Sequence, residues 1–126
     1  MSNKVHILFI FVLLISTSAC RQDNTANDSD YPFIVEGELP ASPPAIELIT
    51  DAANDLAERE NVRINEVTFV ALELPVWSDT SYGCPDPETA YLFTPKEGYK
   101  IQLRVNGRDF FYHGGEDIEQ FLCENN

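Results

Sequence analysis

The chain has 126 residues, and its 21 acidic against 8 basic side chains give a net charge of −13 at neutral pH. With 44% hydrophobic and 11% aromatic residues, it is too apolar for a wholly disordered chain, and its length allows one small domain. This acidity excludes nucleic-acid binding because phosphate backbones would be repelled, and the length argues against a large cofactor-binding enzyme.

The first nineteen residues have the form of a secretory signal peptide. Lys4 supplies a positive start, residues 5–15 are apolar apart from His6, and small polar residues follow at positions 16–19. The apolar run is too short for a membrane-spanning helix, which needs about 20 residues. We therefore expect residues 1–19 to be a targeting segment rather than part of the fold.

Residues 17–20, Thr-Ser-Ala-Cys, resemble the lipobox of bacterial lipoproteins. In that family the cysteine is acylated and becomes the mature N-terminus, so the resemblance implies a lipid, such as palmitate, on Cys20. The protein would then be anchored in the membrane of the bacterial cell envelope, with its domain outside the cytoplasm. Thr17 departs from the usual Leu, and the alternative is an ordinary secretory signal cut near Ala19.

Residues 20–42 are rich in Asp, Asn, Ser, Glu and Pro, a composition typical of a flexible acidic tether. Their one apolar island spans residues 31–35. This island has an alternative role as an extra edge strand, since Pro32 is tolerated at a strand start or edge. The single folded domain is expected over residues 43–126.

A helix and then a strand are predicted at the start of this domain. Ser42 can cap a helix, and prolines at its first positions cost no hydrogen bond. Apolar residues then recur at helical spacing up to about residue 60. From Ile64 to Leu74 the chain becomes β-branched and aromatic, which predicts a central or helix-covered strand.

A β-hairpin is the clearest local signal in the sequence. Residues 100–105 alternate apolar and polar side chains up to Asn106-Gly107, the pair typical of a two-residue type I′ turn. This turn sets Arg104 opposite Asp109, an opposite-charge pair that supports the register. The same register puts four side chains on the core face: Ile101, Leu103, Phe110 and Tyr112.

Beyond the hairpin, the spacing of Ile118, Phe121 and Leu122 predicts a short C-terminal helix. The expected fold class is therefore α+β, with one N-terminal helix packed on an antiparallel sheet of about three strands. One disulfide completes the expectation: once Cys20 carries lipid, Cys84 and Cys123 remain as an even pair in an oxidising compartment. Their bond would pin the long loop between residues 76 and 98.

The residues around these cysteines resemble a family of small, uncharacterised, secreted or lipid-anchored bacterial domains. The pattern reads W-x-D-x-S-x-G-C-P from Trp77, then a Tyr, G-Y-x-I, Y-x-Y-H and L-C, and it spans about residues 45–123. Tyr82 stands where the family has Leu, and Phe110 where it has Tyr. The resemblance supports the disulfide and implies no known activity.

His113 is the one candidate general base, but the sequence favours a structural role for it. Oxidation of Cys84 removes the nucleophile of a Cys/His hydrolase. A Ser81, His113 and Asp79 triad lacks the frame of known hydrolases. One histidine without a free cysteine pair falls short of a zinc site. We expect His113 to make a hydrogen bond to the loop, and no catalytic residue, cofactor or metal.

Asp79, Asp86 and Glu88 match no EF-hand spacing, so solvated carboxylates are favoured over a calcium site. Trp77 and Tyr82 belong either to the lid of the small core or to a binding patch. With Asp79 and His113 they are the candidate binding residues.

The sequence leaves two functions open. One is a binding or accessory module that uses the disulfide-pinned loop 77–85, with a cationic envelope or extracellular protein as its partner. The other is an inhibitor of a hydrolase, namely a protease, that presents loop 80–85. An enzyme is not expected.

Overall fold

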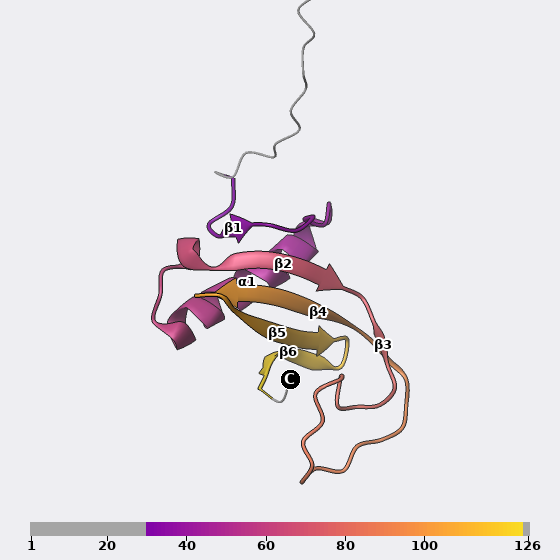
Figure 1. Ribbon diagram of the computed structural model, residues 1–126. Coiled ribbons are helices and arrows are strands. Elements are labelled where there is room, and N and C mark those ends of the chain that lie inside the picture. The colour runs from indigo at the N-terminus through magenta and orange to yellow at the C-terminus, as the bar shows by residue number, and fades with distance from the viewer. Residues whose placement is uncertain (1–29, 125–126) are drawn as a thin grey trace, which may run out of the picture.

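The structure, a computed structural model, describes residues 30–124. Figure 1 shows a long helix beside a twisted sheet, with a long loop extending from one end of the sheet. No helix in this range is long and apolar enough to cross a bilayer. The elements in chain order are β1 (Ile34–Val35), α1 (Pro43–Glu60), the 3-10 helix η1 (Ile64–Glu66), β2 (Thr68–Glu73), β3 (Val76–Trp77), β4 (Lys96–Val105), β5 (Arg108–Gly115) and β6 (Ile118–Cys123).

The predicted helix is confirmed at both ends. Ser42 is the N-cap residue, and its carbonyl, rather than its hydroxyl, accepts the bonds from Ala45 and Ile46. Asn61 ends the helix in the left-handed conformation, with φ of 53°, and its N–H bonds back to the last turn. Five side chains on one face of α1 are buried: Ile49, Ala52, Ala53, Leu56 and Ala57.

Six strands form a mixed sheet in the described residues, in the order β1-β2-β4-β5-β6, with β3 paired to one end of β4. The two-residue strand β1 runs parallel to β2, and the other pairs are antiparallel. The expectation of about three strands is therefore wrong. Sequence patterning gave β1 only as an alternative and missed β3, because each has two residues, too few to show a period of two.

The hairpin register is as predicted. Leu103 lies opposite Phe110, and Arg104 lies opposite Asp109. Arg104 Nε donates to Asp109 Oδ1 at 2.7 Å, so the opposite-charge pair forms. Of the four side chains expected on the core face, Ile101, Leu103 and Tyr112 are buried and Phe110 is partly buried.

The predicted C-terminal helix is wrong, because residues 118–123 form strand β6. Phe111 pairs with Cys123 and His113 with Phe121 along β5. A segment of six residues is too short to form a stable helix alone, whereas pairing with β5 satisfies its backbone groups at once. The spacing of Ile118, Phe121 and Leu122 was thus consistent with a helix without requiring one.

The apolar island within the expected tether is packed against the domain. Ile34 donates its backbone N–H to Val67 at 2.8 Å. Phe33 is only 2% exposed and its ring lies 6.5 Å from that of Phe69. The alternative of an extra edge strand is therefore correct, and Pro32 lies just before the strand, where its missing N–H costs no ladder bond.

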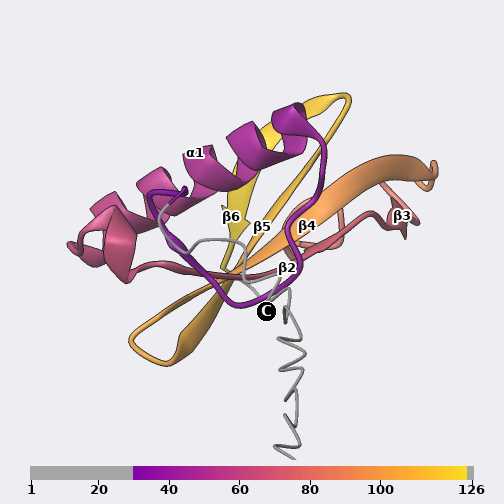
Figure 2. The same ribbon diagram turned by 90° about the horizontal axis from the view of Figure 1, so that it is seen from above.

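Each face of the sheet is partly covered, one by the helix and the other by a loop. Helix α1 lies across one face and forms the main core with it (Figure 2). The opposite face carries the other side chains of β5 and β6, among them His113, Phe121 and Cys123. The long loop between β3 and β4 covers these residues, and this second, smaller cluster includes the candidate site.

Candidate functional site

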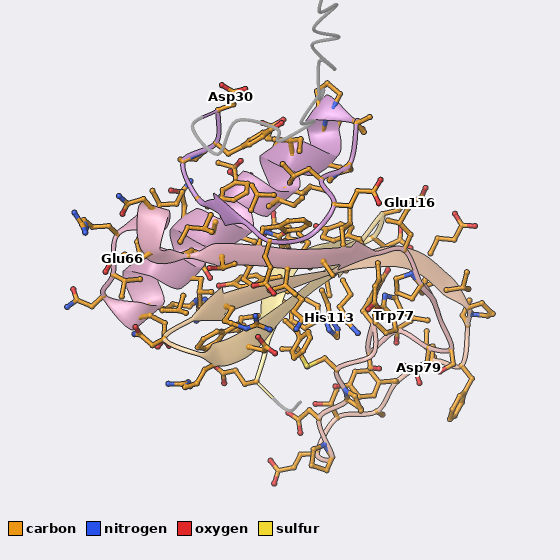
Figure 3. All side chains as sticks on the ribbon, turned by 45° about the horizontal axis from the view of Figure 1, so that its top comes forward. Asp30, Glu66, Trp77, Asp79, His113 and Glu116 are labelled. Atoms are coloured by element: carbon orange, nitrogen blue, oxygen red, sulfur yellow. A yellow bond between two sulfur atoms is a disulfide. The ribbon has the colours of Figure 1, made fainter. Side chains whose placement is uncertain are left out.

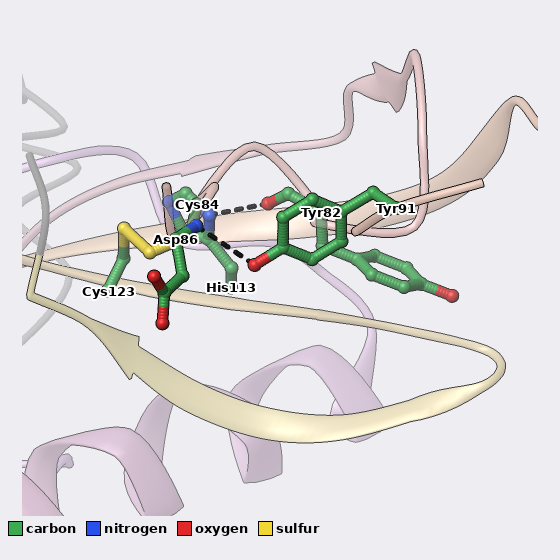
Figure 4. The surroundings of a disulfide bond; sticks show 6 residues. All are labelled: Tyr82, Cys84, Asp86, Tyr91, His113 and Cys123. Carbon is green, nitrogen blue, oxygen red and sulfur yellow. Dashed lines mark hydrogen bonds between the residues drawn. A yellow bond between two sulfur atoms is a disulfide. The ribbon is translucent and has the colours of Figure 1, made fainter. Parts of the chain in front are cut away.

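The loop between β3 and β4, residues 78–95, is held at three places, and we call it the pinned loop. The disulfide joins Cys84 to Cys123 of β6, with a Cα–Cα distance of 5.7 Å, as predicted. Two hydrogen bonds, of 3.1 and 3.0 Å, join Thr80 and Leu92. The backbone N–H of Asp86 donates to the Tyr91 hydroxyl at 2.9 Å (Figure 4).

His113 lies at the centre of the cluster under this loop and is 1% exposed. Its Nδ1 is 2.7 Å from the carbonyl oxygen of Tyr82 (Figure 4). Because a carbonyl only accepts, Nδ1 carries the proton and Nε2 keeps a lone pair. That Nε2 is buried with no hydrogen-bond partner in residues 30–124. The structural role expected for His113 is therefore present.

Two aromatic rings enclose the imidazole. The Trp77 indole stacks on His113 with ring centroids 4.9 Å apart, and both side chains lie near the base of the loop (Figure 3). Phe121 meets the ring edge-on at 6.0 Å. Burial between these groups lowers the pKa of His113, and the charge of Lys100 lowers it further. The Tyr82 hydrogen bond and Glu73 act in the opposite direction.

Tyr82 is a buried residue rather than an exposed binding aromatic, at 3% exposure. Its backbone has a φ of 52°, unusual for a residue other than glycine. The left-handed turn continues through Gly83, with φ of 73°, where the Trp77 ring occupies the space that a Cβ would need. Trp77 and Tyr82 therefore form the lid of the second cluster.

The structure does not join Ser81, His113 and Asp79 into a catalytic triad. The Ser81 backbone N–H donates to Asp79 Oδ1 at 2.9 Å. Hydrogen bonds from the Ser81 hydroxyl and N–H hold the pKa of Asp79 below its usual value. In the described residues the His113 imidazole bonds to Tyr82 and to neither Ser81 nor Asp79. Asp79 thus shapes the start of the loop.

The other loop carboxylates are structural or solvated. Asp86 Oδ1 accepts the backbone N–H of Glu88 at 2.8 Å, which closes a local turn. Over residues 30–124 no group of three or more His, Cys, Asp or Glu side chains is arranged to hold a metal ion. Cys20 lies outside the described residues.

The sequence analysis missed the most exposed aromatic of the loop. Phe93 is 91% exposed and Leu92 is 71% exposed. Both lie in the outer part of the pinned loop, after the disulfide, where residues 85–90 are also exposed. Two adjacent apolar residues outside any alternating pattern, followed by Pro95, were the available signal. The segment 80–85, in contrast, has Ser81 and Tyr82 buried.

These features define a small disulfide-stabilised domain of one helix on a mixed sheet, with a loop pinned to the face opposite the helix. The chain belongs to the family described as a domain of unknown function, DUF8738, which matches residues 49–123. This agrees with an uncharacterised domain, as the sequence pattern indicated. Searches of curated proteins and of solved structures give no match.

Proposed function

We propose that this protein is a non-catalytic binding module of the bacterial cell envelope, lipid-anchored through Cys20, that contacts a partner through the outer part of the pinned loop. The observation that carries the proposal is the exposure of Phe93, 91%, and Leu92, 71%, on this loop. Exposed aromatic side chains that become buried supply much of the energy of protein interfaces.

The anchoring of the loop supports this role. The disulfide holds the loop at Cys84, and the two hydrogen bonds with Thr80 hold Leu92 directly. The backbone next to Phe93 is therefore fixed before a partner binds. Ordering a flexible loop costs free energy on binding, and a pre-ordered loop avoids that cost. The exposed Asp86 and Glu88 on the same segment favour a positively charged partner.

The location rests on two features of the chain. The signal-like segment and lipobox-like residues end at Cys20. A disulfide between Cys84 and Cys123 is typical of proteins outside the cytoplasm. Both favour the cell envelope.

Inhibition of a protease by residues 80–85 is supported less well. A substrate-like inhibitory loop must offer its side chains to the protease cleft, and here Ser81 is 6% and Tyr82 3% exposed. The exposed apolar pair lies later in the loop. The geometry therefore favours a binding surface at residues 92–93.

The test is site-specific photocrosslinking in cells that express the full chain. A benzophenone amino acid replaces Phe93 in one strain and Glu58, on the exposed side of α1, in a matched control. We expect a discrete adduct from position 93 and none from 58. Phe93→Ser should weaken capture of that partner about tenfold, and Leu74→Ser, an equally exposed apolar site outside the loop, should not. Equal crosslinking from 93 and 58 would overturn the proposal.

A further inference from the structure

A second candidate binding surface lies between α1 and β6, and none of the residues that line it belongs to the pinned loop. It is a groove of about 1060 Å³. Its apolar surface includes Leu48 of α1, Tyr99 of β4 and Leu122 of β6. We call it the acidic groove because of the carboxylates around it.

The groove continues along the free edge of the sheet. β6 is the last strand in the sheet order and pairs only with β5 (Figure 1). All the residues from Ile118 to Leu122 line the groove. Since alternate side chains of a strand point to opposite faces, the groove must reach the strand edge itself. Unpaired N–H and C=O groups at such an edge can accept a further strand.

The charges of the groove are unbalanced. Arg59 is its single cation and pairs with Asp55. Every Lys and Arg in residues 30–124 forms an ion pair. Asp55 is the one groove carboxylate that takes part in any of these pairs. Five groove carboxylates form no ion pair in this part of the chain, although Lys96 acts on Glu116 and Arg59 on Glu124 at longer range. They are Asp51, Glu97, Glu116, Glu119 and Glu124.

These carboxylates are spread along the groove rather than gathered around one point. In the described part of the chain, no cluster of acidic, His or Cys residues suits a metal ion. A ligand with several separated positive charges would match them better than a single divalent ion. The amide oxygen of Gln120, also in the groove, is shielded from water and lacks a hydrogen-bond partner within residues 30–124.

We propose that the acidic groove binds an extended, positively charged segment of a partner protein, which adds as a strand to the edge of β6. The segment's Lys or Arg side chains would meet Glu116 and Glu119, and its apolar side chains would rest on Leu48 and Leu122. Backbone bonds to a sheet edge give such complexes affinity, while the side-chain contacts give specificity. This site is independent of the loop surface proposed above.

The test uses the full chain and a synthetic twelve-residue peptide of alternating Lys and Val as the probe. Fluorescence anisotropy should show saturable binding that weakens with salt. Glu116→Gln with Glu119→Gln should weaken binding about tenfold. The matched control, Glu47→Gln with Glu58→Gln, makes the same charge change outside the groove and should change affinity less than about twofold.

Two further measurements separate strand addition from simple charge attraction. The same peptide with alternate backbone nitrogens methylated keeps its charge, but it cannot donate those hydrogen bonds, and we expect about a tenfold loss. Phe93→Ser should leave peptide binding unchanged, so the proposals for the two surfaces can be tested separately. Absence of saturable binding, equal effects of the two double variants, or full binding of the methylated peptide would overturn the proposal.

Discussion

Gly83 shows how one residue links the pinned loop to the second cluster. Its φ of 73° is unfavourable for any side chain, and a Cβ there would overlap the Trp77 ring. Gly107 in the hairpin turn has a similar φ of 75°, but there a Cβ would meet open space. We predict that Gly107→Ala costs about 1 kcal/mol of unfolding free energy, from the backbone term alone.

Gly83→Ala should cost at least about 1 kcal/mol more than Gly107→Ala, because the Trp77 ring must move as well. Urea unfolding of the two variants measures the difference. Equal costs would mean that Trp77 does not rest on Gly83.

His113 is predicted to make the domain acid-sensitive. Burial lowers its pKa in the folded state, while the unfolded chain titrates near 6.5. Between these two values the unfolded state binds more protons, so unfolding free energy falls as the pH drops below about 6.5 and levels off below the folded pKa. Above about 6.5 the contribution is complete.

His113→Asn isolates this effect, because it removes the titrating group and leaves a side-chain N–H near the Tyr82 carbonyl. The variant should be less stable at neutral pH but should lack the histidine part of the slope. Denaturant unfolding of both proteins between pH 5 and 7.5 provides the comparison. Parallel pH profiles would contradict this prediction.

At the scale of elements, the sequence predicted those whose signal is local. Helix α1 was predicted because its caps and its apolar periodicity lie within the segment itself. The β4–β5 hairpin was predicted with its register because Asn106-Gly107 fixes the turn. β6 was mistaken for a helix, since its partner β5 decides its conformation. β1 depends likewise on contact between Phe33 and Phe69, which local patterning does not reveal.

The candidate site was predictable in part for the same reason. The disulfide followed from counting cysteines, and the hydrogen bond of His113 to the loop followed from its place at the end of the hairpin. Which loop aromatic faces solvent was not predictable. Tyr82 is buried at a left-handed turn whereas Phe93 is exposed, and the positive φ of Tyr82 gives no sequence signal.

The hairpin register predicts a contrast between adjacent residues. Leu103 is fully buried against α1, whereas Gln102 lies on the other face and is partly exposed. Leu103→Ala should lower unfolding free energy by about 2–5 kcal/mol, and Gln102→Ala by less than about 0.5 kcal/mol. Thermal and urea unfolding test both, and similar losses at the two positions would contradict the register.

The disulfide is expected to be a major source of stability. Cys84 and Cys123 are 39 residues apart, and the loop-entropy relation gives about 4 kcal/mol for such a closure. The double variant Cys84→Ala with Cys123→Ala should have a free energy of unfolding lower by about that amount. It should therefore unfold at a lower denaturant concentration. A matching control is the wild type under reducing conditions, which should behave like the variant. Two alkylatable thiols in the unreduced protein would refute the bond.

At the scale of the whole molecule, the position of Cys20 directly after a signal-like segment and lipobox-like residues predicts attachment to a membrane. Metabolic labelling with a fatty-acid analogue should tag the wild type, and Cys20→Ala should abolish the label and leave an unlipidated precursor or a released protein. Cys84→Ala, which keeps Cys20, is the control and should still be labelled. A wild-type protein without label would rule out the lipid anchor.

The stacking of Trp77 on His113 gives the molecule a built-in optical reporter. Trp77 is the chain's one tryptophan, and it lies over the second cluster, at the start of the pinned loop, rather than in the core beneath α1. Its emission therefore reports on the second cluster and the base of the pinned loop. Movement of the loop, protonation of the imidazole or reduction of the disulfide can each be followed in solution by fluorescence, without attaching a dye and without unfolding the helix-covered core.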